Sequence, residues 1–443
     1  MTSVFRLPSR PVATTVLGLG LVGLGLGLAG SGSRLGTLIA THAPALVVFV
    51  GVIAVGDLFR LRMPSGRETA PLASASALAV AFVGTINGEA VFDIDPGLVA
   101  LVVTVALALA AAVHRAQHRS PGVPQLAARL LGVGLAAVLA REVGPEGATL
   151  WDDQALEGYA RGLVAVGLVG VALVAIVVEL VLVSAIRAER QRSPWTAAVR
   201  DELTEAAPLT LAVVVTGPMV ALMAPVLGLV ALPAALVPLV MAYAAVGQFA
   251  RNRATNRQLI ATLSVLTEEG GYTRRLHAER VSGLAVRVGR VLGLGDRELR
   301  DIEYAALLHD LGQISLRDPI PDGATVLAAP ADQRDIAAEG ARIIRRAETL
   351  DVVAAYVEAQ TTPYRLVREL GEPVPIGSRI IKCANAFDDL TQGSSDPARV
   401  TAALERIHLG LGYEYDPDVV DALSRVVEHS SVGRLAEEPL LAR

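Results

Sequence analysis

Long apolar runs fill the first 250 positions of the chain, and shorter amphipathic segments follow them to the C-terminus. An apolar stretch of about 18 residues can cross the ~30 Å hydrocarbon layer of a membrane as a helix. The third and fifth runs are the weakest. The pattern predicts about eight helical spans, at 13–30, 36–56, 70–87, 97–114, 125–141, 160–186, 206–227 and 229–249.

The distribution of arginine gives an independent test of these spans, because cytoplasmic loops of membrane proteins collect Arg and Lys. With the N-terminus inside, the predicted outer segments hold only Arg34, Arg141 and Arg161, together with most of the acidic residues of this half. The inner segments hold fourteen arginines, at positions 6, 10, 60, 62, 67, 115, 119, 187, 190, 192, 200, 251, 253 and 257. We therefore expect both termini inside and a multi-pass protein of the cell (inner or plasma) membrane.

Two motifs in the apolar half suggest binding functions that we do not favour. The letters GLGLVG, from Gly18 to Gly23, match the dinucleotide-binding pattern GxGxxG, but no strand precedes them. Gly23 and Gly27 also form a GxxxG pair, so close helix packing is the preferred interpretation. His114 and His118 have a spacing that suits a shared metal, but no carboxylate lies nearby in sequence. The few charges within the spans disfavour a pump or an ion-coupled transporter.

The part of the chain from residue 251 onward has the pattern of a soluble helical domain. Residues 251–273 predict a polar-faced helix with Leu259, Leu263 and Leu266 on one stripe, which is too short to establish a coiled coil. Apolar residues then recur at helical spacing, and no alternating strand pattern occurs. Further helices are predicted at 281–291, 296–308, 333–348, 350–360, 376–391, 396–408 and 417–430.

These patterns predict an all-α protein with a polytopic membrane region. The expected divisions are a membrane region at 1–250, a connector helix at 251–274, a helical cytoplasmic domain at 275–432 and a tail at 433–443. Composition agrees, because the chain is 52% hydrophobic and 19% charged, whereas soluble domains carry about 25% charged residues. Cys383 is the only cysteine, so an intrachain disulfide is excluded, and Lys382 is the only lysine.

Candidate chemistry lies in the segment AALLHDLGQISL, where His309 and Asp310 are adjacent at the end of an apolar run. His277 lies early on the preceding helix, so a bundle can bring the three side chains together. Imidazole nitrogen and carboxylate oxygen suit Mn, Fe, Zn or Mg, and such a metal can activate water for attack on a phosphoryl group. A hydrogen-bonded structural pair is the alternative, and the residues by themselves leave both open.

Five segments occur in order over 255–430, and together they resemble the HD superfamily of metal-dependent phosphohydrolases, specifically its HD-GYP branch. They are YTRRLHAERV, AALLHDLGQI, GARIIRRAETLDVVAAYVEA, SRIIKCANAFDDLTQG and GLGYEYDPDVVDAL. The resemblance implies an all-helical domain with a metal centre that hydrolyses cyclic di-GMP, often fused to membrane sensor regions.

By position, the resemblance makes His277 the first metal ligand and His309 with Asp310 the defining pair. Asn385 stands where the family has its last metal aspartate, and Gln313 stands where a lysine meets the substrate phosphate.

Other family positions are replaced as well. The family's third histidine falls on Ile336, beside Asp335, and its paired histidines fall near Glu358 or Gln360. The GYP triplet is absent.

These replacements weaken the expected centre, because Asn385 brings no negative charge to a metal and Gln313 no positive charge to a phosphate. A mononuclear site at His277, His309 and Asp310 is expected at most, with Asn385 as a weak ligand. The first hypothesis is a degenerate HD-GYP-like regulator or binding module. An active phosphodiesterase with a minimal centre is the alternative, and a transporter or scaffold regulated by the domain is the third. Whether the chain is an enzyme stays open.

The expected cofactor is a divalent metal, Mn, Fe or Mg, or none. The expected partners are the lipid bilayer, a cyclic dinucleotide and a second copy of the chain, since the connector helix and related domains favour a homodimer. Nucleic-acid binding is not expected, because the soluble half lacks a basic surface with interleaved aromatic residues.

Overall fold

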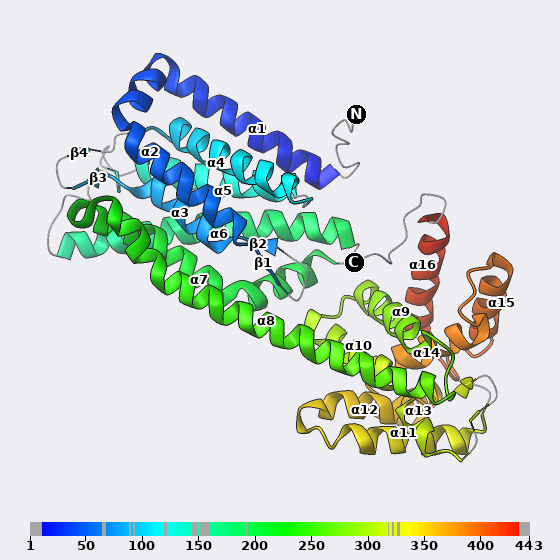
Figure 1. The fold of residues 1–443 in the computed structure, drawn as a ribbon. Helices are drawn as coiled ribbons and strands as arrows, with labels where there is room; N and C mark the ends of the chain where they lie inside the picture. Colours follow the sequence, from blue (N-terminus) through cyan, green and yellow to red (C-terminus); the bar gives the residue numbers. More distant parts are fainter. Residues whose placement is uncertain are drawn as a thin grey trace. The chain divides into compact units, whose positions relative to one another are not determined.

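The structure is a computed structural model, and it describes residues 11–63, 68–87, 90–91, 94–118, 122–143, 149–150, 159–191, 194–317, 319–320, 323–325 and 328–433. The chain divides into two compact units, Met1–Gln191 with Ala198–Arg251, and Arg192–Ala197 with Asn252–Arg443. Helices dominate both (Figure 1), which confirms the predicted all-α fold.

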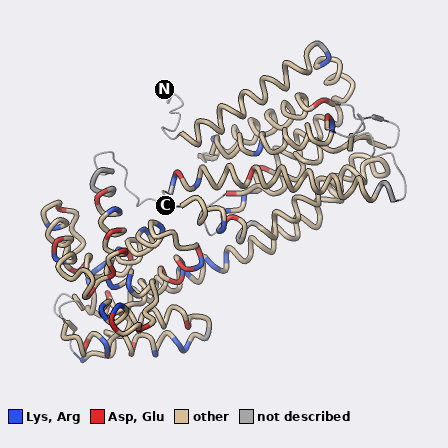
Figure 2. The backbone as a smooth tube through the Cα atoms, turned by 180° about the vertical axis from the view of Figure 1, so that it is seen from behind, with Lys and Arg blue, Asp and Glu red and all other residues tan. Residues whose placement is uncertain are grey.

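The first unit is a bundle of long apolar helices with two small hairpins. Its helices are α1 (Pro11–Ser31), α2 (Leu35–Leu58), α3 (Pro71–Phe82), α4 (Pro96–Ala116), α5 (Val123–Arg141), α6 (Tyr159–Gln191), α7 (Trp195–Leu227) and α8 (Ala231–Glu269), with 3-10 turns η1 (Gly32–Arg34) and η4 (Gly228–Val230). The first turn of α7 and the part of α8 from Asn252 onward belong to the second unit. The antiparallel hairpins pair β1 (Leu61–Arg62) with β2 (Glu68–Thr69), and β3 (Thr85–Ile86) with β4 (Ala90–Val91). Charged residues are sparse along α1 to α7 (Figure 2).

Six stretches of the described helices are long and apolar enough to cross a membrane: Pro11–Ser31, Leu35–Leu58, Pro96–Ala116, Val123–Arg141, Gly162–Arg190 and Ala207–Glu269. The last stretch contains two of the predicted spans, 206–227 and 229–249. The predicted span at 70–87 is different. Its helix α3 has only 12 residues, or ~18 Å at ~1.5 Å per residue, because the chain turns into a hairpin at each end. It is too short to be a lipid-facing span.

Helix α3 is enclosed by protein, and Arg141 of α5 compensates its free end. Nearly every residue of α3 is buried. The Arg141 guanidinium donates from Nε to the Ala81 carbonyl (2.7 Å) and from Nη2 to the carbonyls of Val83 (2.7 Å) and Val80 (3.3 Å). The last carbonyls of a helix lack partners within it. This buried arginine therefore satisfies the end of α3.

The glycine-rich segment of α1 serves helix packing, as predicted. A Cβ built on Gly97 of α4 would lie 2.1 Å from the carbonyl oxygen of Gly27, so the two backbones are in direct contact there. A Cβ on Gly20 would lie 3.1 Å from the Ala127 side chain of α5. Small residues allow helices to approach this closely in apolar surroundings.

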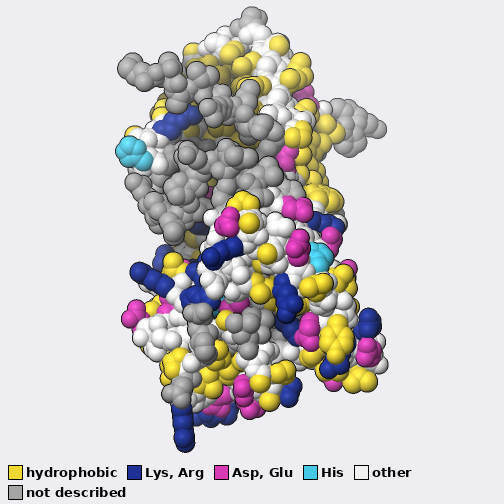
Figure 3. Space-filling view, turned by 90° about the vertical axis from the view of Figure 1, so that its right-hand side faces the viewer, with side chains coloured by type: hydrophobic (Ala, Val, Ile, Leu, Met, Phe, Trp, Pro, Cys, Tyr) yellow, Lys and Arg dark blue, Asp and Glu magenta, His cyan; other side chains and the backbone are white. Residues whose placement is uncertain are grey.

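The second unit is a bundle of short amphipathic helices. They are α9 (His277–Val291), α10 (Asp296–Leu308), α11 (Pro330–Ile344), α12 (Asp351–Ala359), α13 (Tyr364–Leu370), α14 (Ile376–Thr391), α15 (Pro397–His408) and α16 (Pro417–Gly433), with 3-10 turns η5 (Leu311–Ser315) and η8 (Glu348–Leu350). The apolar faces of these helices, α13 excepted, form one core, to which Ile260 of α8 also belongs. Basic and acidic side chains lie interspersed on the face shown in Figure 3.

Candidate metal centre

Two helix ends position the candidate ligands. His277 is the first residue of α9 and follows Leu276, whose φ of 59° lies in the left-handed region that side chains rarely adopt. His309 and Asp310 follow the last residue of α10 and lead into η5. Because α9 and α10 pack against each other in one core, these two ends bring all three side chains into the interior of the domain.

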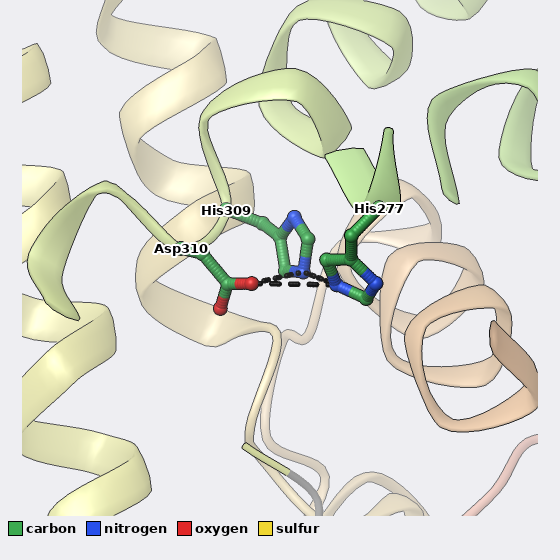
Figure 4. Close-up of side chains that lie close together, drawn as sticks. All are labelled: His277, His309 and Asp310. Atoms are coloured by element: carbon green, nitrogen blue, oxygen red, sulfur yellow. Dashed lines mark hydrogen bonds and ion pairs between the residues drawn. The ribbon is translucent and has the colours of Figure 1, made fainter. Parts of the chain in front are cut away.

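Three ligand atoms converge there (Figure 4). His277 Nε2 lies 3.3 Å from His309 Nε2 and 3.3 Å from Asp310 Oδ2, and His309 Nε2 lies 3.2 Å from Asp310 Oδ2. Metal–ligand bonds of ~2.1 Å at tetrahedral or octahedral angles separate neighbouring ligand atoms by roughly 3.0–3.4 Å. The triangle therefore has the dimensions of one metal site. Among the described residues, these three form the single group of His, Cys, Asp or Glu close enough to share an ion.

The far side of each imidazole ring is held by an acceptor. His277 Nδ1 donates to Asp388 Oδ2 (2.8 Å), and His309 Nδ1 donates to the Ala306 carbonyl (2.8 Å). A neutral ring whose Nδ1 carries the proton presents a lone pair on Nε2. Both lone pairs then point toward Asp310 Oδ2, a buried oxygen without a hydrogen-bond partner. Three electron-rich atoms facing one another require a cation between them, either a metal ion or a proton.

The protonation of the metal-free site follows from these contacts. Burial by itself lowers the pKa of His277, but the neighbouring carboxylates of Asp310 and Asp388 outweigh it and raise that pKa to about 10. Burial raises the pKa of Asp388, and the hydrogen bonds from His277 and Arg280 reverse this and lower it. Asp310 behaves similarly, since the neighbouring histidines lower its pKa against the effect of burial. Without a metal, His277 therefore holds a proton among carboxylates.

Asn385 and Gln313 lie near the triad in different ways. Asn385, on α14, donates from Nδ2 to Thr325 Oγ1 (3.0 Å), and its Oδ1 is buried without a hydrogen-bond partner. Gln313 is fully buried in η5, with Nε2 3.5 Å from the Gly323 carbonyl and Oε1 without a hydrogen-bond partner. Asn385 can offer a neutral oxygen, and Gln313 is packed inside the domain.

A cavity of about 50 Å³ adjoins the triad. Gln360 fixes one wall by donating from Nε2 to the His309 carbonyl (2.9 Å). Ile336 presents an apolar side chain where the family's third histidine was expected. The residues that line the cavity are His309, Asp310, Thr325, Gln333, Ile336, Gln360, Thr361, Lys382, Asn385, Ala386 and Tyr415. One water needs roughly 10–15 Å³ of such volume, so a phosphate group fits here and a nucleobase does not.

Two residues of this site were not anticipated from the sequence. Lys382 Nζ donates to the carbonyls of Thr361 (3.1 Å) and Thr362 (3.2 Å) and to Glu414 Oε2 (2.8 Å). Asp388, described above, holds the ring of His277. Lys382 and Asp388 lie three residues before and after Asn385 on α14, so helical spacing from Asn385 could have identified both.

Among the described residues, Glu358, His408 and His114 do not belong to the triad. Glu358 pairs with Arg345. His408 is exposed and donates from Nδ1 to the Leu404 carbonyl (2.7 Å). The side chain of His429 lies outside the described residues. His114 packs against α2, with Nε2 3.2 Å from the carbonyl oxygen of Asp57.

Comparisons with known proteins point to the same region of the chain. Residues 265–419 match the family model described as HD domain. The cyclic di-GMP phosphodiesterase response regulator RpfG of Xanthomonas campestris pv. campestris is 30% identical over 167 residues, which are 33% of this chain and 42% of that protein.

Two further relatives are more distant in sequence. A cyclic di-GMP phosphodiesterase of Thermotoga maritima is 24% identical over 180 residues, 38% of this chain and 49% of that protein. The 3'3'-cGAMP-specific phosphodiesterase 2 of Vibrio cholerae is 25% identical over 181 residues, 39% and 35% of the two chains. The chain thus spans less than half the length of each of these relatives. No solved structure matches it.

Proposed function

Because residues 265–419 form a domain of the HD superfamily, of the HD-GYP type, we propose that the chain is a membrane-anchored regulator. In this proposal the domain binds a cyclic dinucleotide, holds at most one divalent metal ion, and hydrolyses its ligand slowly or not at all. The relatives named above are phosphodiesterases of cyclic dinucleotides, which supports this class of ligand.

One observation carries the proposal: the three donors of a single metal site converge, while the described residues around them supply no further anionic ligand. The cavity beside the triad is walled by Ile336, Gln360 and Asn385, none of which carries charge. The donor set of two imidazoles and one carboxylate suits Mn or Fe better than Mg, which prefers oxygen ligands. Such an ion would polarise a phosphoryl oxygen and acidify a bound water.

The chain's own residues favour binding over rapid turnover. Lys382 is the single Lys or Arg among the described residues that line the cavity, and its three N–H donors already have acceptors. A phosphate in the cavity therefore finds hydroxyl and amide groups but no free cation. Transition states of phosphoryl transfer are stabilised chiefly by positioned positive charge, so this site lacks a main source of rate.

An active phosphodiesterase is the second candidate, and the convergence of His277, His309 and Asp310 favours it. Both rings are held by second partners, as in working metal sites. In this alternative a single metal suffices for measurable turnover.

The test uses the full chain in lipid nanodiscs. We expect close to one Mn or Fe per chain, binding of cyclic di-GMP, and little hydrolysis by chromatography. His309→Ala removes the metal, whereas His408→Ala, a histidine outside the site, leaves it in place. Rapid hydrolysis that a chelator stops, manganese restores and His309→Ala abolishes would establish the second candidate. Absence of both metal and nucleotide binding would overturn both candidates.

We propose that the first unit crosses the cell membrane with both termini inside. The arginine distribution supports this orientation. An even number of crossings requires α3 to cross as well, surrounded by protein, and it connects hairpin β1–β2 to hairpin β3–β4. Labelling of single cysteines placed at Arg115 and Glu142, in a Cys383→Ser background, tests it. An impermeant maleimide applied to intact cells should reach the second position and not the first; the reverse would refute the orientation.

We also propose a homodimer through the last part of α8. Leu259, Leu263 and Leu266 are 60%, 44% and 55% exposed, and their spacing of four and three residues is that of a coiled-coil seam. In a Cys383→Ser background, Leu263→Cys should form a disulfide-linked dimer on mild oxidation. Ala254→Cys, exposed on another face of the helix, should not. Equal cross-linking of both variants would contradict this interface.

A further inference from the structure

A cluster of charged side chains lies buried within the first unit. Asp57 of α2 is fully buried and accepts a hydrogen bond from Arg129 Nη1 of α5 (2.7 Å) and others from Arg60. Glu179, near the middle of α6, is only 6% exposed. Ionisable groups inside apolar helical bundles are costly, and they mark functional sites more often than structural ones.

Glu179 has a more distant cationic partner than Asp57. The Arg129 Nε atom is its nearest basic group, at 3.7 Å from Oε1, which is too long for a hydrogen bond. Arg129 Nε is itself buried without a hydrogen-bond partner. Asp57 thus has the closer contacts with both arginines. The carboxylate of Glu179 retains lone pairs that no described basic group satisfies.

Glu179 also borders a cavity. Glu179 lines a space of about 30 Å³ together with the hydroxyl-bearing side chains of Thr69, Ser74 and Thr210. The apolar remainder of the wall is Met63, Pro71, Ile176, Leu180, Leu209 and Val213. Since one water needs roughly 10–15 Å³, this cavity holds about two water-sized groups. A nucleotide, a sugar or a lipid headgroup is too large for it.

The chemistry of the wall selects the occupant. One carboxylate and three hydroxyl oxygens offer acceptors to a ligand of positive charge, and hard oxygen ligands suit small cations without a soft-metal preference. A single negative charge matches a monovalent ion better than a divalent ion, which takes more carboxylates.

We propose that the first unit binds one small monovalent cation, Na⁺ or an ammonium ion, between Glu179 and the hydroxyls of Thr69, Ser74 and Thr210. The ion would lie closer to the Glu179 carboxylate than Arg129 Nε, which is 3.7 Å away. This site is independent of the metal centre and of the function proposed for it.

Thermal unfolding of the full chain in nanodiscs tests the site, with Na⁺, K⁺, NH₄⁺, methylammonium or choline added at constant ionic strength. A ligand that binds only the folded state raises its stability by RT ln(1 + [L]/Kd). We expect a saturable rise of the midpoint with Na⁺ or NH₄⁺ and none with choline, which exceeds the cavity. The Na⁺ and NH₄⁺ arms identify which ion is preferred.

Variants separate the site from general effects of charge. Glu179→Gln should weaken the apparent affinity at least tenfold, and Thr210→Val should weaken it severalfold. Glu202→Gln removes another buried carboxylate of this unit that does not line the cavity, and it should keep the ion dependence. If Glu179→Gln fails to fold, Thr210→Val and Ser74→Ala carry the comparison. Equal midpoints in Na⁺, NH₄⁺ and choline, or an unchanged response in the cavity variants, would overturn the proposal.

Discussion

Replacing Asp388 by Asn tests the metal centre through a residue that does not touch the metal. In the folded chain both oxygens of Asp388 are occupied, by His277 Nδ1 (2.8 Å) and by Arg280 Nε (2.7 Å) and Nη2 (2.9 Å). An amide offers one acceptor oxygen and one NH₂ group. Either His277 Nδ1 or the Arg280 guanidinium would therefore face the new NH₂ group, which is itself a donor. The ring of His277 also loses its anionic partner.

The expected loss of metal affinity depends on how Arg280 and His277 each respond to the substitution. The Arg280 side chain is one third exposed, so it can turn to solvent at small cost. His277 is buried and cannot, and loss of such a partner typically lowers metal affinity 10–100-fold. At about 1.4 kcal/mol per factor of ten, Asp388→Asn should weaken binding by roughly 1.4–2.8 kcal/mol.

A competition titration of Mn²⁺ against a fluorescent chelator, on the full chain in nanodiscs, measures this change. Asp421→Asn is the control, because Asp421 is an exposed aspartate of α16 that pairs only with Arg425 among the described residues. It should change the affinity less than twofold. If Asp388→Asn also stays within twofold, then His277 does not ligate the metal in the orientation seen here, and the reasoning fails.

Four further predictions concern the same domain. The pKa of His277 is raised from 6.5 to about 10, so its proton stabilises the metal-free fold fully below pH 6.5, and this contribution is lost toward pH 10. Metal binding should therefore release about one proton between these pH values, and metal affinity should increase with pH. A pH-independent metal affinity would contradict this. Gly312→Ala should lower the unfolding midpoint, because the added Cβ would lie 1.9 Å from a carbonyl oxygen of α11, whereas Gly283→Ala, with open space around it, should stabilise α9 by ~0.5–1 kcal/mol; equal midpoints would refute the contact. Burial raises the pKa of Cys383 to about 12, so iodoacetamide at pH 8 should label it only after unfolding, as mass spectrometry would show. Asn385→Asp should raise Mn²⁺ affinity in the same competition titration, and no change would mean that Asn385 lies outside the coordination sphere.

The sequence predicted local features well and tertiary convergence only in part. Helical periodicity and the HD pair were sufficient to select His277, His309 and Asp310, because each lies at a helix end whose position the apolar pattern defines. The partner of His277 was missed, because Asp388 is 111 residues away along the chain and only its helical spacing from Asn385 marks it. The span predicted at 70–87 was too long for a related reason: apolar residues continue beyond α3, but there they form hairpin and loop.

The burial of Arg141 is a second tertiary feature that the sequence did not predict. Its position beside an acidic segment indicated an outer loop, and the structure instead places its guanidinium inside the first unit, against carbonyls 58 to 61 residues earlier in the chain. A hydropathy pattern predicts that an arginine is exposed to water, because its burial is tolerated only where hydrogen-bond acceptors surround the guanidinium. Those acceptors belong to α3 and cannot be inferred from the neighbours of Arg141 in sequence.

The dependence of α3 on Arg141 has a consequence for biosynthesis. A helix of 12 residues leaves polar backbone groups within the hydrocarbon layer, where neither water nor lipid can bond them. The group that satisfies them is translated some sixty residues afterwards, at the end of α5. In the topology proposed above, the nascent chain must therefore shelter α3 in the translocon or at the membrane surface until α5 emerges, and α3 enters the bilayer out of its order of synthesis.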